Sequence, residues 1–190
     1  MTGEQRPTFV PPVPEGVFLL LRPVQPVDAE YIHGLRVNTA YNLHLSYVTS
    51  TVEGQRAWIE RYQEREAVRK EIYYIIERSD TGINCGTVRL YNITADSFTW
   101  GSWILDGSKP PKAALESAVM SFGVGFGDLG CNLASVDVRV GNSHAVAFYR
   151  SLRMTETHRT AQDIYFDYPR ARFEADRGGY MKILTREFKP

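Results

Sequence analysis

The first third of the chain predicts one strand and two helices. An apolar run at residues 17–22 is typical of a short strand, and Asp28 is placed to cap a helix over residues 29–35. Residues 36–50 are polar and aromatic without a clear period, so we expect a loop with one helical turn. A second helix begins near Ser50 and has one apolar face and one strongly charged face.

Three strands in close succession follow this helix. Residues 71–77 and 85–92 are rich in β-branched and aromatic side chains, and Ser79–Gly82 between them is a strong hairpin signal. A further turn leads into a strand at residues 98–105. Short connections between neighbouring strands predict an antiparallel meander.

The second half of the chain changes to alternating helices and strands. The expected elements are a helix over residues 113–128, a strand at 132–140, a helix over 143–152, a strand at 163–168, a charged loop over 169–179 and a last strand at 180–188. The whole order, βααβββαβαββ, describes a mixed α/β fold and not a doubly wound parallel sheet. We expect a single domain over residues 16–190, after a flexible Pro-rich lead-in at residues 1–15.

Composition narrows the class of protein. The chain is 43% hydrophobic and 23% charged, with 22 basic and 22 acidic side chains, so net charge favours neither a nucleic-acid nor a membrane partner. The N-terminal apolar run is too short for a signal peptide or a membrane span. Cys85 and Cys131 form no metal-binding pattern and fit a reducing compartment. We expect a cytoplasmic monomer or homodimer without a metal site.

A loop before the predicted helix at residue 113 is a candidate anion site. The amides of Lys112, Ala113 and Ala114 lie where a helix begins, and Lys109 and Lys112 add positive charge. Prolines 110 and 111 lack N–H groups, so the later amides must carry the binding. The alternative is an ordinary Pro-started helix with solvated lysines.

The next helix carries the second candidate. Asn142 can cap it, Ala145 and Phe148 share one face, and Tyr149 lies beside that face. A phenol with a pKa of about 10 could protonate a departing thiolate whose own pKa is about 8.5. The alternative is that Tyr149 simply packs in the core.

Residues 100–154 resemble the Gcn5-related N-acetyltransferases, the GNAT family, which use acetyl-coenzyme A. The family motif Asn-x-x-Ala-x-x-Phe/Leu-Tyr is matched at Asn142, Ala145, Phe148 and Tyr149. In the family's phosphate loop, Gln/Arg-x-x-Gly-x-Gly/Ala, this chain has Lys109 first, Lys112 in place of the central glycine, and Ala114 last. Arg153–Met154 stands where a Gly-Phe pair is usual.

The resemblance implies an acyl-CoA N-acyltransferase fold with a mostly antiparallel, partly splayed sheet between helices. It places Trp103, Ile104 and Leu105 beside the cofactor and makes Tyr149 the general acid. The amine attacks the thioester directly, so no acyl-enzyme nucleophile is needed. Proximity and backbone donors then supply much of the rate.

The acceptor amine is suggested by a narrower resemblance. Residues 88–105 and the upstream Leu35-Arg36-x-Asn38 resemble enzymes that acetylate the 4-amino group of nucleotide-linked deoxysugars. The candidate acceptor residues are Arg36, Asn38, Tyr41, Arg89 and Trp100. Both arginines could instead be ordinary surface charges.

Two other functions remain open. The peptide N-terminal acetyltransferases of ribosomal proteins share the element order and a W-x-x-x-Y helix, here Trp58 to Tyr62. A non-catalytic acyl-CoA-binding module is the third possibility, favoured by the unusual phosphate loop. The general base stays unassigned among Glu77, Asp96, His33, His44 and a water chain to a backbone carbonyl.

Overall fold

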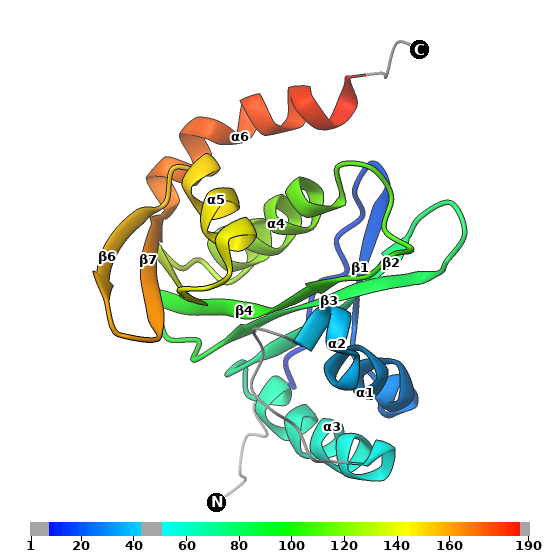
Figure 1. Ribbon diagram of the computed structural model, residues 1–190. Coiled ribbons are helices and arrows are strands. Elements are labelled where there is room, and N and C mark those ends of the chain that lie inside the picture. Colours follow the sequence, from blue (N-terminus) through cyan, green and yellow to red (C-terminus); the bar gives the residue numbers. More distant parts are fainter. Residues whose placement is uncertain (1–7, 43–50, 187–190) are drawn as a thin grey trace, which may run out of the picture.

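The computed structural model describes residues 8–42 and 51–186, and within them one mixed sheet lies between two layers of helices (Figure 1). The strands are β1 (Leu19–Pro23), β2 (Ile72–Arg78), β3 (Asn84–Tyr91), β4 (Ser97–Leu105), β5 (Leu133–Arg139), β6 (Thr155–Arg159) and β7 (Asp163–Pro169). The helices are α1 (Ala29–Val37), α2 (Thr39–Asn42), α3 (Val52–Ala67), α4 (Ala113–Gly123), α5 (Ser143–Ser151) and α6 (Arg170–Thr185). Helices α1 to α3 cover one face, and α4 to α6 lie on the other (Figure 1).

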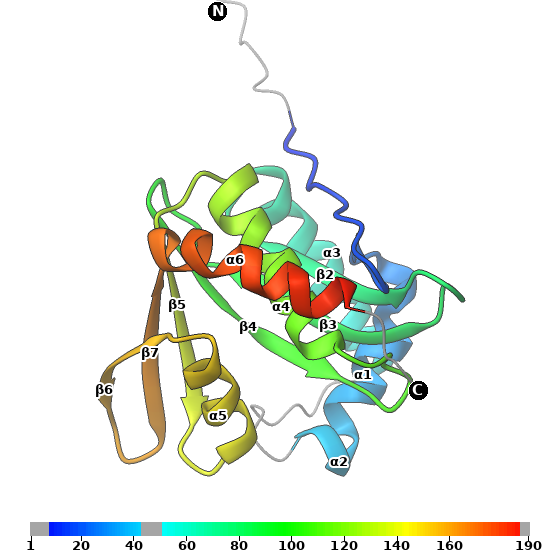
Figure 2. The same ribbon diagram turned by 90° about the horizontal axis from the view of Figure 1, so that it is seen from above.

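The sheet order is β1-β2-β3-β4-β5-β7-β6, and only β4 and β5 run parallel. Their pairing stops after Thr99 and Ser135, while β4 continues to Leu105 and β5 to Arg139. Figure 2 shows the two strands side by side at one end and diverging toward α5. This divergence leaves backbone groups of both strands without a ladder partner, which opens the sheet for a ligand.

The mixed α/β fold is confirmed, and the predicted order holds from β1 to α5 with the short helix α2 added; the predicted strand at residues 163–168 is β7, preceded by the unpredicted β6 and followed by helix α6. The hairpin of β2 and β3 is also confirmed, as is the helix beginning near residue 50, which Thr51 caps by accepting the Gly54 N–H at 3.1 Å. The predicted helix over residues 113–128 exists, although its last turn, Val124–Asp128, is a π-helix.

The predicted last strand is wrong. Its described residues up to Thr185 belong to α6, which also takes in most of the expected charged loop. The final strand pair is instead β6 and β7, an antiparallel hairpin at the sheet edge. Strand β6 escaped prediction because no residue in it is buried, so it has no hydrophobic pattern to read.

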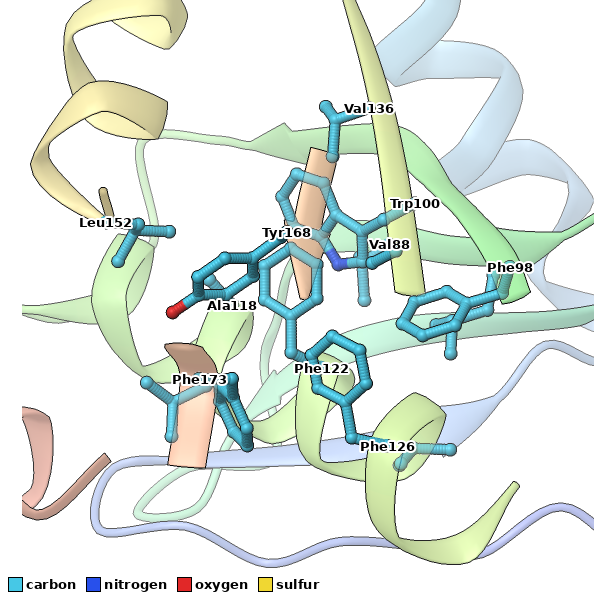
Figure 3. Packing of buried hydrophobic residues seen from close by; sticks show 14 of the residues in the cluster. Val88, Phe98, Trp100, Ala118, Phe122, Phe126, Val136, Leu152, Tyr168 and Phe173 are labelled. Carbon is cyan, nitrogen blue, oxygen red and sulfur yellow. The ribbon is translucent and has the colours of Figure 1, made fainter. Parts of the chain in front are cut away.

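The main core lies between the sheet and α4 (Figure 3). Trp100 of β4 is fully buried and stacks on Phe122 of α4 with ring centroids 4.9 Å apart. Phe173 of α6 packs against Phe126 at 5.2 Å, so α6 takes its place by extending this aromatic cluster. Both views show α6 crossing over α4 (Figures 1 and 2).

The N-terminal segment is packed along the sheet from residue 8 onward. The Phe9 N–H donates to the Ala67 carbonyl at 3.1 Å, and the Pro12 carbonyl accepts the Tyr74 hydroxyl at 2.9 Å. Residues 1–7 of the expected lead-in lie outside the described residues. The domain boundary at residue 16 stays a prediction.

Candidate active site

A cavity of about 810 Å³ lies where β4 and β5 diverge. It is larger than the two hollows of about 340 and 480 Å³ that lie elsewhere on the described part of the chain. Its wall is formed by Arg36, Ala40, Tyr41, Tyr73, Tyr91, Gly101, Ser102, Trp103, Ile104, Leu105, Lys109, Asp137, Val138, Arg139, Asn142, His144, Tyr149 and Asp163. These residues come from both helical layers and from five strands, so the cavity depends on the whole fold.

A bulge in β4 shapes one wall. The register shifts between Thr87 and Arg89 of β3, where β4 has an extra residue, and Ser102 adopts a left-handed backbone with φ 47°. The Thr87 hydroxyl fixes the bulge by donating to the Ser102 carbonyl at 3.0 Å. Because of the extra residue, Trp100 and Trp103 both face α4, although three positions separate them.

The expected cofactor residues of β4 lie together at the cavity. Trp103, Ile104 and Leu105 all line it. The Trp103 indole N–H donates to the Ser117 hydroxyl of α4 at 3.1 Å, and its ring stacks on Phe148 of α5. Phe148 and Ala145 pack against the main core behind the cavity wall.

The loop before α4 offers amides of the kind that bind phosphate. The first-turn N–H groups of Ala114 and Leu115 have no acceptor among the described residues, whereas the Ala113 N–H donates to the Pro110 carbonyl at 3.3 Å. Lys109 lines the cavity nearby. A pyrophosphate-bearing cofactor fits this end of the site, because free amides at a helix N-terminus favour anions.

The Lys112 side chain has a different position from that of Lys109. Its ammonium donates to the carbonyls of Leu184 and Arg186, at 3.2 and 2.7 Å, where α6 ends. A cation is favourable there because the last carbonyls of a helix carry partial negative charge. The Lys112 backbone, with φ 65°, begins α4 in the left-handed conformation that glycine usually takes.

Helix α5 sets the orientation of Tyr149. The Asn142 side chain caps the helix by accepting the Ala145 N–H at 3.1 Å. Tyr149 is 5% exposed, lies edge-on to Trp100 and Phe166, and lines the cavity. Burial raises the pKa of the Tyr149 phenol, and the charge of Asp137 raises it further. The phenol therefore stays protonated at neutral pH and can act as a proton donor.

The expected acceptor residues separate into three groups. Arg36 and Tyr41 line the cavity, and the Tyr41 hydroxyl also accepts the Gly107 N–H at 3.1 Å. Asn38 lies in an adjoining hollow, where it caps α2 through the Ala40 N–H. Arg89 and Trp100 are not among the cavity-lining residues.

Both of those side chains are occupied elsewhere. The Arg89 guanidinium is ion-paired with Glu71, which is buried, and lies over the rings of Trp58 and Tyr91. The Trp100 indole donates to the Ser121 hydroxyl at 2.8 Å inside the core.

Three of the residues considered for the general base fall in the described ranges, and none of the three lines the cavity. Glu77 accepts a hydrogen bond from Arg22 at 2.7 Å. Asp96 accepts one from Asn132 at 2.6 Å, at the end of the sheet where β4 and β5 are still paired. His33 lies on α1 outside the cavity lining, and His44 is outside the described residues.

The cavity also contains polar residues that the sequence did not single out. Asp137 and Arg139 project from β5, Asp163 from β7, and His144 from α5, while Tyr73 and Tyr91 come from β2 and β3. The alternation along β5 could have pointed to them. Ala134, Val136 and Val138 are buried, and the polar residues between them share the opposite face of the strand. The sequence alone could not show that this polar face meets a cavity.

Within residues 8–42 and 51–186, no three or more His, Cys, Asp or Glu side chains gather as metal ligands. None of the helices in the described ranges combines the length and apolar composition needed to cross a bilayer.

Known proteins resemble the chain over nearly its whole length. Residues 19–155 match the acetyltransferase (GNAT) domain. The structure of FdhC, described as a nucleotide-linked sugar GNAT, is 34% identical with a TM-score of 0.85, and the match covers 92% of this chain and 99% of FdhC. No match is found among curated proteins.

More distant structures share the fold. A Gcn5-related N-acetyltransferase from Brucella melitensis is 14% identical with a TM-score of 0.77, over 95% of this chain and 88% of that one. A spermidine N-acetyltransferase, SpeG, from Vibrio cholerae is 19% identical with a TM-score of 0.67, over 83% of this chain and 97% of that one. The splayed sheet, the family match and the identity to FdhC together show that this chain belongs to the GNAT family of N-acetyltransferases.

Proposed function

We propose that the protein transfers an acetyl group from acetyl-coenzyme A to the amine of a nucleotide-linked amino sugar, such as a 4-amino-deoxysugar. The observation that carries this proposal is the distribution of charge in the cavity. Arg36 has no hydrogen-bond or ion-pair partner among the described residues, and carboxylates of β5 and β7 line the same cavity. An acceptor with an anionic nucleotide and a cationic amine suits such a site.

The likeness to FdhC supports the same acceptor class. FdhC is described as a nucleotide-linked sugar GNAT, and the match spans 99% of its chain at 34% identity. Arginine suits the phosphates because its planar guanidinium can bind their oxygens in pairs. Tyr41 and Tyr73 offer aromatic surface beside Arg36.

The residues of the cofactor half have separate roles in this proposal. Acetyl-coenzyme A supplies the acetyl thioester when bound. The Ala114 and Leu115 amides with Lys109 would hold its pyrophosphate, and the unpaired edge of β4 at Trp103 to Leu105 would hold its pantetheine arm. Tyr149 donates the proton that the departing sulfur requires.

The remaining expectations are part of the same proposal. Asn142, Ala145 and Phe148 shape the cofactor side through α5, and Lys112 and Ala113 through the start of α4. Asn38, Arg89 and Trp100 stay candidates for the acceptor side, acting through the walls rather than from the cavity surface. We place the enzyme in the cytoplasm, since Cys85 and Cys131 are buried free thiols.

A two-stage experiment tests the proposal. Titration calorimetry with acetyl-coenzyme A should show binding in the micromolar range, and no binding at high micromolar concentration would contradict it. A thiol-release screen should then cover nucleotide-linked amino sugars, peptides with a free N-terminus, and spermidine. Release with peptides alone would favour the peptide N-terminal acetyltransferase, and binding without release from any amine would favour a non-catalytic module.

A further inference from the structure

Asp137 lies at the point where the sheet opens. The parallel pairing of β4 and β5 stops at Ser135, and Asp137 is the next residue of β5 on the same face. That face is the one opposite α4, because the alternate residues Val136 and Val138 are buried on the α4 side. The Asp137 carboxylate therefore lines the cavity beside the gap between the diverging strands.

The groups around Asp137 come from four elements. They are Tyr91 of β3, Arg139 of β5, Tyr149 of α5, and Asp163 and Tyr165 of β7. Arg139 is ion-paired with Asp163 at 3.2 Å, and Arg89 with Glu71. Asp137 has no ion-pair partner of its own among the described residues.

The Asp137 side chain is open to solvent on the cavity side. Partial desolvation by the cavity walls raises the pKa of its carboxyl, the charge of Asp163 raises it further, and the charge of Arg139 lowers it. A carboxylate with a raised pKa is a stronger base than an ordinary aspartate. Tyr91 and Tyr149 both have pKa values raised in part by Asp137, so its charge acts on the reacting end of the cavity.

The other polar groups of the cavity suit this task less well. The Asp163 carboxylate is already ion-paired with Arg139, which leaves it less available to bind the acceptor ammonium. His144 lies in the first turn of α5, a helix end whose partial positive charge repels the acceptor ammonium. The phenols of Tyr73, Tyr91 and Tyr149 are protonated, because burial raises the pKa of each.

We infer that Asp137 is the general base of the reaction, binding the acceptor ammonium and taking one of its protons. This inference rests on the proposed function. The nitrogen lone pair thus freed forms the C–N bond to the acetyl carbon, and the C–S bond of the thioester breaks. Tyr149 gives its proton to the sulfur and regains one from the nitrogen, which leaves an amide, a thiol and one proton on Asp137 that passes to water.

The test is a comparison of kcat across pH for the wild type and two variants of the full chain. Asp137→Asn keeps the size of the side chain and removes the base, so kcat should fall roughly 10²-fold or more near neutral pH. The difference in kcat between the wild type and Asp137→Asn should become smaller as the pH approaches the pKa of the acceptor amine, because more of the amine is then deprotonated before it binds. Asp137→Ala should regain activity when formate is added, which a purely structural residue would not.

Two controls make the comparison selective. Asp167→Asn changes a carboxylate on the same face of the sheet, outside the cavity, where it accepts from Ser135 at 3.0 Å; its kcat should stay within about twofold of the wild type. Calorimetry should give acetyl-coenzyme A affinities for the Asp137 variants within about twofold of the wild type, which shows that they fold.

An active wild type together with an Asp137→Asn variant of equal kcat and unchanged pH profile would overturn the inference alone. A wild type that releases no thiol with any amine would overturn the proposed function, and the inference with it.

Discussion

The indole of Trp103 and the ring of Phe148 stack with centroids 5.0 Å apart and planes 27° from parallel. The pair joins β4 to α5. Trp103 reaches this position only because the bulge at Ser102 turns its side chain toward α4. The bulge therefore links a backbone irregularity to the shape of the cofactor side.

The first prediction concerns this bulge. Ser102→Val should destabilise the fold by about 1–2 kcal/mol, since a β-branched residue is strongly disfavoured at positive φ. Ser102→Gly should be close to neutral, because glycine adopts that backbone freely. Urea unfolding measures both, and equal losses for the two variants would contradict a conformational role for Ser102.

The second prediction concerns Tyr149. Tyr149→Phe keeps the packing against Trp100 and Phe166 but removes the hydroxyl, so kcat should fall about 10²-fold while acetyl-coenzyme A affinity stays within twofold. Because the pKa of this phenol is raised, it remains a donor beyond the usual phenol range of about 10. The wild-type rate should therefore show no loss of the acid below that pH, and unchanged turnover in Tyr149→Phe would remove Tyr149 from the reaction.

The third prediction separates the two lysines of the phosphate loop. Lys109 lines the cavity, so Lys109→Gln should weaken acetyl-coenzyme A binding several-fold with little change in stability. Lys112 holds the end of α6, so Lys112→Gln should lower the free energy of unfolding by about 0.5–1 kcal/mol. Calorimetry with acetyl-coenzyme A and urea unfolding measure both effects in each variant. Weaker cofactor binding in Lys112→Gln, with unchanged binding in Lys109→Gln, would show that Lys112 and not Lys109 contacts the phosphate.

The fourth prediction concerns Arg36. Arg36→Ala should raise KM for a nucleotide-linked acceptor about tenfold or more, because a charge-assisted contact to phosphate is lost. The same change should leave KM for a small amine without phosphate almost unaltered. Arg56→Ala, on the exposed face of α3, is the matched control. An equal loss with both acceptors would assign Arg36 to the structure of the wall.

The sequence predicts an element well where its buried apolar residues recur at the regular spacing of a helix or a strand. The hydrophobic residues of β2 to β4, α4 and α5 follow such spacings, and the structure contains all of these elements. The sequence predicts a loop and a strand where α6 lies, because Gly178–Gly179 indicate a turn and residues 180–184 contain closely spaced apolar side chains. Its buried residues, Phe173, Tyr180 and Leu184, lie at helical spacing, and their packing outweighs the roughly 1 kcal/mol that each glycine costs a helix.

The sequence predicts only part of the candidate site, for a different reason. The motif from Asn142 to Tyr149 is local, so the sequence located it and its helix. Asp137 belongs to the site only because β4 and β5 separate after a short stretch of pairing. That separation depends on contacts from distant segments, which a pattern of neighbouring residues does not contain.

The most direct test of the central claim compares one amino sugar with and without its nucleotide. The wild-type enzyme, supplied with acetyl-coenzyme A, should acetylate the nucleotide-linked sugar with a kcat/KM at least about tenfold above that for the free sugar, since the phosphates gain charge-assisted contacts at Arg36. Thiol release gives the rate, and mass spectrometry of the product gives the site of acetylation. Equal kcat/KM for the two sugars, or transfer to peptides or spermidine alone, would contradict the account.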